Sequence, residues 1–305
     1  MTEPTPLPFI DPPPLPDWLS KAFPFRRRVF GGGRWPMHFV DEGQGPVILL
    51  QHGNPTWSFL WRKVIRLLAD ANVRVIVPDM VGLGLSAKPH EVGLHSLRFH
   101  ALNLSRLVQA LDLNAITIVG QDWGGPIVAL MAYYNSDRVR GAVFGNTALA
   151  APYKKRRLST FHRLAHLPLV SDLLFRAVNF PVPVLHRAQG DPASIGSLER
   201  RAYGWPLKAF RDRTAPLALA RMVPTGPQHP TSPYMRKVQS WGKTFRGPVR
   251  LVWGLKDPIL GRALKNMRGL FPEALVTETQ AGHFLQEEVP EALAEAILAV
   301  VKGRS

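Results

Sequence analysis

An aspartate occupies the centre of the segment Val-Gly-Gln-Asp-Trp-Gly-Gly at residues 119–125. The G-x-D-x-G spacing is that of a sharp turn from a strand into a helix, a turn that most often carries a nucleophilic serine. A carboxylate there, Asp122, is a nucleophile suited to an alkyl carbon, and the start of the helix would help to keep it ionised. The next residue, Trp123, offers one indole N–H donor beside an apolar ring. The alternative is that Asp122 is an ordinary helix N-cap.

A second candidate segment is the His-Gly-Asn-Pro turn at residues 52–55, which follows a short apolar run. A turn of this kind can present a backbone N–H to developing negative charge, as an oxyanion hole does. The side chain of Asn54 adds an amide donor. The alternative is a turn that is stabilised by a local Asx contact.

The third candidate is the late pair Asp257 and His283, each of which follows a predicted strand. A histidine can act as a general base, and a nearby carboxylate can hold its ring in the correct tautomer. The alternatives are a core histidine and a surface Asp-Pro turn. Because open α/β sheets bind ligands at the carboxyl ends of their strands, all three segments are expected to meet at one edge.

The elements that position these residues follow an alternating pattern. Strand-like apolar runs and helical patterns succeed one another along the chain, which predicts a mostly parallel sheet flanked by helices. Strands are predicted at 25–32, 35–43, 47–53, 73–80, 115–122, 139–146, 249–257 and 274–280, and helices near 58–70, 95–112, 124–136, 262–270 and 288–301. Between the sixth and seventh strands, residues 147–240 are helical in pattern, basic and interrupted by prolines, which predicts an inserted cap.

Composition narrows the class of protein. The chain has 305 residues, of which 46% are hydrophobic, enough for one large α/β domain with an insertion. It has no cysteine, which excludes disulfides and thiolate metal sites and is consistent with the cytoplasm. The proline-rich residues 1–22 do not resemble a signal peptide, and the apolar run at 292–301 is too short to span a bilayer.

The net charge of +16 is concentrated in the cap, where 15 Lys and Arg face 4 Asp and Glu. Such a surface can attract nucleic acid, anionic lipid or acidic partners. No nucleic-acid-binding module accompanies the charge, so a solvated basic surface is the favoured interpretation and no specific nucleic-acid partner is expected.

Taken together, these segments resemble the haloalkane dehalogenases of the α/β-hydrolase superfamily, over roughly residues 25–302. The nucleophile–acid–base order along the chain is that of α/β-hydrolases. The resemblance implies an α/β-hydrolase fold with a mostly parallel eight-stranded sheet. Together with the composition and pattern along the chain, it predicts an extension at 1–22, a core at 23–146 and 241–305, and a helical cap at 147–240. The matching segments are HFVDEG (38–43), QHGNPTWSFLWR (51–62), PDMVGLGLSAKP (78–89), VGQDWGGPI (119–127), GLKDPILG (254–261) and AGHFLQEEVPE (281–291).

The resemblance also assigns roles to individual residues. Asp122 would be the nucleophile, His283 the base and Asp257 the acid that orients the base, with no metal and no cofactor. Asn54 and Trp123 would bind the departing halide, and their backbone N–H groups would hold the oxyanion. The presence of Asn54 together with Asp257, and of Asn146 after the sixth strand, resembles the type III subgroup, some of whose members self-associate.

The implied chemistry explains the aspartate in the turn. Asp122 would displace halide from a haloalkane and become an alkyl ester, and water activated by His283 would then hydrolyse the ester to an alcohol, halide and a proton. One preorganised donor such as Trp123 or Asn54 is worth about 3 kcal/mol, or a hundredfold in rate.

The main alternative is an epoxide hydrolase, which resembles this chain in its aspartate nucleophile and uses cap tyrosines as the acid. The cap contains Tyr153, Tyr203 and Tyr234. A fluoroacetate dehalogenase would be expected to carry an arginine near the turn, and a non-catalytic protein of the same fold would be expected to lose a catalytic residue. Cap aromatics that are candidates to line the pocket, or alternatively to pack within the cap, are Phe161, Phe175, Phe180, Trp205 and Phe210.

Overall fold

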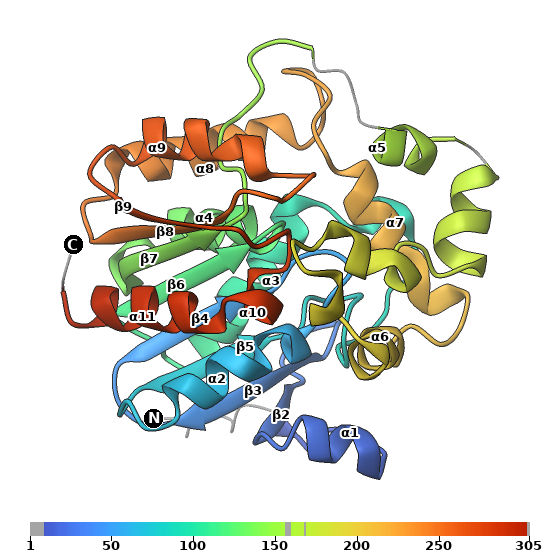
Figure 1. Ribbon diagram of the computed structural model, residues 1–305, viewed down its shortest axis with the longest axis horizontal. Coiled ribbons are helices and arrows are strands. Elements are labelled where there is room, and N and C mark those ends of the chain that lie inside the picture. Colours follow the sequence, from blue (N-terminus) through green and yellow to red (C-terminus); the bar gives the residue numbers. More distant parts are fainter. Residues whose placement is uncertain (1–8, 156–159, 168, 304–305) are drawn as a thin grey trace, which may run out of the picture.

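The fold is built on a single twisted sheet with helices on both sides and a helical cap at one end (Figure 1). The computed structural model describes residues 9–155, 160–167 and 169–303. The strands lie in the order β1-β2-β3-β5-β4-β6-β7-β8-β9. The pairs from β5 through β4, β6, β7 and β8 to β9 are parallel, and β1, β2 and β3 are antiparallel to their neighbours. This arrangement confirms the predicted mostly parallel α/β-hydrolase fold.

Eight of the nine strands lie within the predicted apolar runs: β2 (Arg27–Phe30), β3 (Met37–Gly43), β4 (Val47–Gln51), β5 (Arg74–Pro78), β6 (Ile116–Gln121), β7 (Val139–Gly145), β8 (Val249–Gly254) and β9 (Leu275–Thr279). The additional strand is β1 (Phe9–Ile10), which lies in the proline-rich extension and pairs with β2. Two residues flanked by prolines carry no strand pattern of their own, so the sequence did not predict this pairing. Residues 1–8 of the extension lie outside the described residues.

The strands at the centre of the sheet are buried on both faces. All six residues of β6 are buried, as are the last four of β4. Continuous apolar strands of this kind require helices on both sides. In Figure 1, α2 (Arg62–Leu68) and α11 (Pro290–Val301) lie on one side, and α4 (Gly124–Tyr134), α8 (Ser232–Thr244) and α9 (Leu264–Leu270) lie on the other. The remaining helices outside the cap are α1 (Asp17–Ala22), η1 (Ser58–Trp61), η2 (Val92–Leu94), α3 (Leu97–Ala110), η3 (Ser136–Arg138), η8 (Gly261–Ala263) and α10 (Leu285–Glu288).

The long connection from β7 to β8 carries the cap. Its short helices follow one another around the carboxyl end of the sheet, and the boundary expected at residue 240 falls inside α8, which packs against α4. We keep the division into extension, core and cap as a prediction. The cap helices are α5 (Thr160–Ala165), η4 (Asp172–Ala177), η5 (Val182–Ala188), η6 (Pro192–Ser194), α6 (Ser197–Gly204), η7 (Arg211–Arg213) and α7 (Thr214–Arg221).

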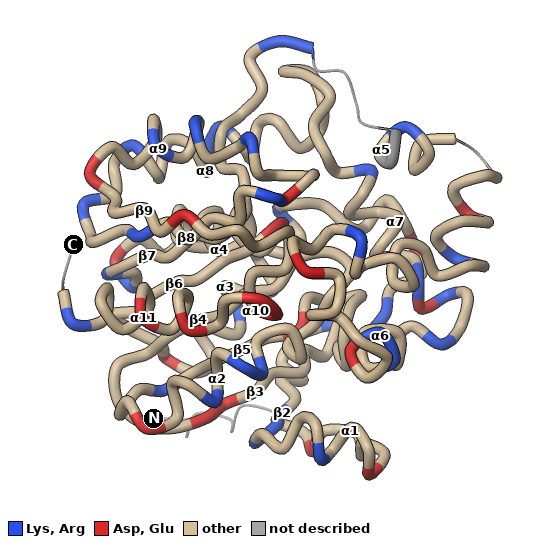
Figure 2. The backbone as a smooth tube through the Cα atoms, viewed as in Figure 1, with Lys and Arg blue, Asp and Glu red and all other residues tan. Residues whose placement is uncertain are grey.

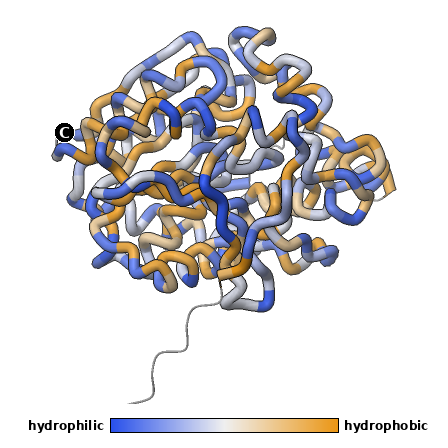
Figure 3. Tube along the Cα trace, turned by 90° about the horizontal axis from the view of Figure 1, so that it is seen from below, coloured by the Kyte–Doolittle hydropathy of each residue, from blue (hydrophilic) through white to orange (hydrophobic). Residues whose placement is uncertain are grey.

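The surface of the cap is both basic and, in one segment, apolar. Lys and Arg recur along its elements in Figure 2. The segment 169–178, at the right-hand edge of Figures 1 and 3, is rich in hydrophobic residues. Several of its apolar side chains are exposed: Leu169, Val170, Leu173 and Val178. In the described part of the chain, no helix has the length and apolar character that crossing a membrane requires.

A buried ion-pair network joins the cap to the core. The Arg62 guanidinium lies 2.5 Å from Glu287 Oε1 and 3.0 Å from Glu199 Oε1, so it connects α2 to α10 of the core and to α6 of the cap. The indole N–H of Trp57 donates to the Ala202 carbonyl of α6 at 3.0 Å. Buried charges are costly unless they are paired. Moving α6 away would separate Glu199 from Arg62, so the network holds α6 against the core.

Candidate active site

The turn after β6 places Asp122 in a left-handed backbone conformation. Its φ is +50°, a value that non-glycine residues rarely adopt and that is found at functional turns. Two contacts hold the turn: the Asp122 N–H donates to the Asn146 carbonyl at 3.1 Å, and the Thr147 hydroxyl donates to the Asp122 carbonyl at 2.6 Å. A Cβ atom at Gly124 would collide with the Gln51 carbonyl, so glycine is needed where α4 begins.

The turn after β4 brings Asn54 against the same carboxylate. The backbone N–H of Asn54 donates to Asp122 Oδ1 at 2.8 Å. The backbone N–H of Trp123 also acts on this carboxylate and lowers its pKa. Two main-chain donors therefore converge on Asp122 from two different strand ends, which is the arrangement of an oxyanion hole.

The side-chain donors of these two residues differ in their availability. One N–H of the Asn54 amide donates to the Pro216 carbonyl in the cap at 3.0 Å. The second N–H of the amide makes no hydrogen bond to the described residues and can therefore donate to a ligand. Trp123 is 8% exposed, and its indole N–H makes no hydrogen bond to the other described residues. Asn54 and Trp123, like Asp122, line the cavity that is described below.

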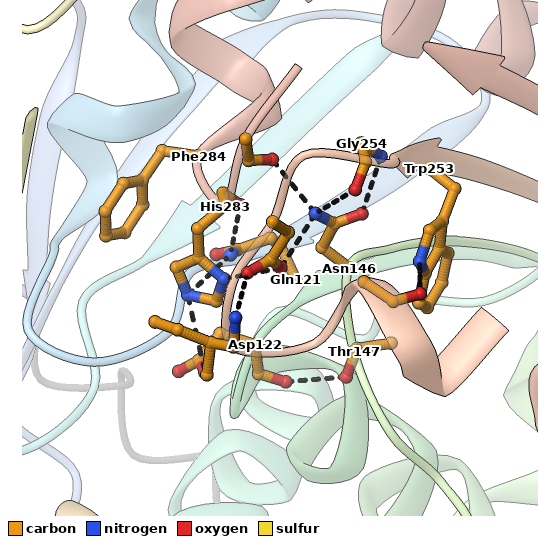
Figure 4. Close-up of polar contacts among 12 residues, drawn as sticks. Gln121, Asp122, Asn146, Thr147, Trp253, Gly254, His283 and Phe284 are labelled. Carbon is orange, nitrogen blue, oxygen red and sulfur yellow. Dashed lines mark hydrogen bonds and ion pairs between the residues drawn. The ribbon is translucent and has the colours of Figure 1, made fainter. Parts of the chain in front are cut away.

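His283 and Asp257 meet at the same end of the sheet, after β9 and β8. The ring Nδ1 of His283 lies 2.9 Å from Asp257 Oδ2, and the backbone N–H of Ile259 donates to Asp257 Oδ1 at 2.7 Å. On its other side, His283 Nε2 lies 3.6 Å from Asp122 Oδ2. Figure 4 shows the His283 imidazole beside the Asp122 side chain, with a dashed line between the two. The structure thus brings Asp122, His283 and Asp257 together, along with Asn54 and Trp123.

Two further polar residues complete the site: Asn146, which the sequence indicated only as a mark of the subgroup, and Gln121, which had no expected role (Figure 4). The Asn146 amide donates to Asp257 Oδ2 at 2.8 Å and to the Gly282 carbonyl at 2.9 Å. The Gln121 amide donates to the His283 carbonyl at 2.9 Å. For Gln121, its place at the end of β6, directly before Asp122, was the only signal in the sequence.

The electrostatics suit a base flanked by two acids. Burial lowers the pKa of His283, but the adjacent carboxylates of Asp257 and Asp122 outweigh it and hold the pKa above its ordinary value. Burial raises the pKa of Asp257, yet the charge and hydrogen bond of His283 bring it below the usual range. Burial raises the pKa of Asp122, and here the opposing effects of His283 and of the backbone donors do not cancel it. Asp257 is the acid that stays ionised most readily.

A cavity of about 800 Å³ lies between the core and the cap, above Asp122. Its wall is mostly apolar, as expected of a site for a small apolar ligand. The core contributes Asn54, Pro55, Asp122, Trp123, Pro126, Pro258, Ile259, Leu260, His283 and Phe284, and the cap contributes Ala148, Ala150, His162, Phe180, Pro181, Val184, Leu185, Arg187, Ala188, Ala220, Val223, Pro224 and Met235.

The candidate cap residues separate into two groups. Of the aromatic candidates, Phe180 lines the cavity. Phe175 is instead buried in a small cluster within the cap, Trp205 packs edge-on against Trp18, and Phe210 lies on the surface under the Arg176 guanidinium. The side chain of Phe161 lies outside the described part of the structure.

The three cap tyrosines lie away from the cavity wall. Tyr203 is buried, and its hydroxyl donates to Glu287 Oε1 at 2.5 Å. Tyr153 is 81% exposed. Tyr234 is in α8 and is not among the residues that line the cavity. Within the described residues, no group of three or more His, Asp and Glu side chains is arranged to hold a metal ion.

Comparison with known proteins shows which family the chain belongs to. Residues 46–174 match the family described as the alpha/beta hydrolase fold. The chain is 35% identical, over 91% of its length and 96% of the relative's, to haloalkane dehalogenase 2 of Mycobacterium tuberculosis. It is 33% identical, over 86% of both chains, to a haloalkane dehalogenase of Mycolicibacterium paratuberculosis.

Solved structures give the same result. The chain resembles the tetrameric haloalkane dehalogenase DpaA of Paraglaciecola agarilytica with a TM-score of 0.77 and 26% identity, covering 90% of this chain and 93% of that one. It resembles haloalkane dehalogenase DatA of Agrobacterium tumefaciens with a TM-score of 0.78 and 26% identity, covering 92% and 97%. The family expected from the sequence is thereby confirmed: the chain belongs to the haloalkane dehalogenases, hydrolases of carbon–halogen bonds.

Proposed function

We propose that the enzyme hydrolyses haloalkanes through a covalent ester on Asp122. In the first step an Asp122 carboxylate oxygen attacks the halogen-bearing carbon, a C–O bond forms, and the carbon–halogen bond breaks to release halide. Negative charge moves from Asp122 to the halide. The free indole N–H of Trp123 and the second N–H of the Asn54 amide are the donors for that charge, in an apolar cavity where such donors act strongly.

In the second step His283 acts as general base. It takes a proton from water at Nε2, and the water oxygen bonds to the Asp122 carboxyl carbon. The ester C–O bond then breaks, the leaving oxygen takes up one of the two water protons to become the alcohol, and the other is released to solvent, which regenerates the Asp122 carboxylate and neutral His283. The backbone N–H groups of Asn54 and Trp123 hold the oxyanion in between. The Asp257 carboxylate keeps the proton on Nδ1 and stabilises the imidazolium.

The observation that supports this mechanism most strongly is the convergence on Asp122. Its carboxylate accepts the Asn54 backbone N–H at 2.8 Å and faces His283 Nε2, while His283 Nδ1 contacts Asp257 at 2.9 Å. An epoxide hydrolase would need a proton donor for the alkoxide. The described cap tyrosines do not provide one, because Tyr203 donates to Glu287 and none of the three lines the cavity.

The test is halide release from 1,2-dibromoethane and 1-bromobutane, with Asp122→Ala as the matched control. We expect release that the substitution abolishes. A folded wild-type protein that releases no halide but opens styrene oxide would refute the proposal in favour of the epoxide reaction.

We also propose that the enzyme self-associates. The described structure contains one chain, and the support comes from the relative DpaA, whose solved form is tetrameric. Size-exclusion chromatography with light scattering tests this proposal. We expect the mass of two or more chains of 34.0 kDa each, and the mass of a single chain at all concentrations would refute it.

A further inference from the structure

The loop that carries His283 is held by main-chain and side-chain contacts from the cap. The backbone N–H of His283 donates to the carbonyl of Ala188 at 2.8 Å. The next cap residue, Gln189, is 8% exposed and uses its amide on Phe284: its Oε1 accepts the Phe284 N–H at 2.9 Å, and its Nε2 donates to the Phe284 carbonyl at 3.2 Å. Both polar main-chain groups of the residue after the base are therefore bound by one cap side chain.

The contact between the two segments is too close for other residue types at its centre. A Cβ atom at Gly282 would collide with the Ala188 carbonyl and the Gln189 backbone. The Glu288 carboxylate closes the same junction, because it accepts the Gly282 N–H at 2.6 Å and the Asp191 N–H at 2.6 Å. The loop is thus fixed in register against the cap on both sides of the histidine.

On the opposite side the loop contacts the core. The Gln121 amide binds the His283 carbonyl, and Asp257 binds the ring. The core contacts set the carbonyl and both ring nitrogens of His283, since Gln121 Nε2 also lies 3.3 Å from the ring Nε2, whereas the cap sets its N–H and the chain direction after it. Phe284 lines the cavity, and its ring lies edge-on to the imidazole of His283 with 4.7 Å between the ring centroids. The contacts of Gln189 with the Phe284 backbone therefore also set this part of the cavity wall.

We infer that Gln189 is a positioning residue for the general base, and that through it the cap controls hydrolysis of the ester rather than its formation. The inference rests on the proposed two-step mechanism. The first step needs only Asp122 and the halide donors, none of which contacts Gln189. The second step needs His283 Nε2 correctly aimed, and a displacement of about 1 Å in such a group costs about a hundredfold in rate.

The two steps can be separated by rapid-mixing measurement of halide from 1-bromobutane, with enzyme and excess substrate. In Gln189→Ala we expect a burst of one equivalent of halide per active site at the wild-type rate, followed by turnover about 10–100-fold slower than wild type. The matched control is Gln280→Ala, since Gln280 lies near the same loop but its exposed side chain makes no hydrogen bond to the described residues. The control should behave as wild type.

Each other outcome is informative. Equal loss of burst and turnover would mean that Gln189 only supports the fold, and an unchanged turnover would mean that it has no role; either result overturns the inference while leaving the proposed mechanism intact. A wild-type enzyme that releases no halide would instead refute the mechanism itself. Gln189→Met, which retains the length and packing of the side chain, replaces the alanine variant if the latter does not fold.

Discussion

His283 Nδ1 and Asp257 Oδ2 lie 2.9 Å apart, and the same carboxylate oxygen accepts an N–H of the Asn146 amide at 2.8 Å. The hydrogen bond fixes the proton on Nδ1 and leaves Nε2 as the basic atom facing Asp122. Asn146 occupies the end of β7 and Asp257 the end of β8, so the two strand ends act together on one imidazole. We propose that Asp257, in the loop after β8, is the acid that orients the base, and that Asn146, directly after β7, supports it.

This pairing predicts the pH dependence of ester hydrolysis. His283 must be neutral to act as a base, so the hydrolysis rate should rise with pH through the apparent pKa of His283. Burial lowers that pKa and Asp257 raises it, whereas the further increase due to the Asp122 carboxylate is lost once Asp122 is esterified. In Asp257→Asn the negative charge is removed and the tautomer is no longer fixed. We expect turnover to fall by about 10⁴-fold and the residual acid limb to move to lower pH. Single-turnover rates between pH 5 and 9 measure both, and an acid limb unchanged in the variant would contradict the assignment of Asp257.

The Trp123 indole predicts an effect on the first step. Trp123→Phe retains an apolar ring but removes the N–H donor, so formation of the alkyl ester should slow by about a hundredfold, with hydrolysis much less affected. The control is Trp205→Phe, because Trp205 packs against Trp18 away from the cavity. Rapid-mixing halide release measures the first step directly, and equal rates in the two variants would show that the indole does not bind the leaving halide.

The Tyr203 hydroxyl predicts an effect on stability and not on chemistry. It donates at 2.5 Å to Glu287, which also pairs with Arg62, so Tyr203→Phe removes one hydrogen bond to a charged group. We expect the free energy of unfolding to fall by about 1.5–3 kcal/mol while halide release at 25 °C stays within about twofold. Urea titration and halide assays test this pair of outcomes. A large loss of activity without loss of stability would instead indicate the acid role expected of an epoxide hydrolase.

Buried histidines away from the active site predict acid sensitivity of the fold. His100 is fully buried, neither ring nitrogen has a partner among the described residues, and burial holds its pKa well below 6.5; burial likewise lowers the pKa of the stacked His95 to about 4. Both are therefore neutral in the folded protein but bind protons in the unfolded chain below about pH 6.5. Stability is thus complete above pH 6.5 and is lost as the pH falls from there towards 4, by about 1.4 kcal/mol per pH unit for each histidine.

His100→Leu tests this expectation. The variant removes one of the protonating groups and should lower the slope of unfolding free energy against pH between 6 and 4.5 by about 1.4 kcal/mol per unit. Its stability at pH 8 should be similar to that of wild type or higher, because two unpaired polar atoms leave the core. His90→Leu serves as the control, since His90 is exposed and should leave the slope as it is. Parallel slopes for His100→Leu and wild type would show that the buried imidazole does not account for the acid sensitivity.

Much of the fold could be predicted because local sequence and tertiary structure agree in the core. Continuous apolar runs such as Ile116–Gln121 are strands buried on both faces, and the G-x-D-x-G spacing has few uses other than a strand-to-helix turn. The strand ends therefore indicated Asp122, Asp257 and His283 without any structural information. Short β1 was not predicted, because its two residues depend on pairing with β2 and not on a pattern of their own.

The supporting residues could not be predicted for a different reason. Gln121, Gln189 and Glu288 are common polar residues with no spacing that separates them from surface positions. Gln121 and Gln189 reach the His283 loop from segments far apart in the chain, and Glu288 joins that loop to the cap segment at Gly190 and Asp191. The same holds for the cap wall, where Phe180 faces the cavity but Phe175, five residues earlier, packs inside the cap. Helical periodicity alone does not decide which face of a short, irregular helix is turned to the cavity.

The measurement that tests the covalent mechanism most directly is mass spectrometry of His283→Phe after incubation with 1-bromobutane. Without a base the ester should accumulate, so we predict one equivalent of released bromide and one butyl group on the peptide that contains Asp122, with none in the double variant that also carries Asp122→Ala. Bromide released over many turnovers by His283→Phe, or an unmodified Asp122 peptide after stoichiometric release, would contradict the account.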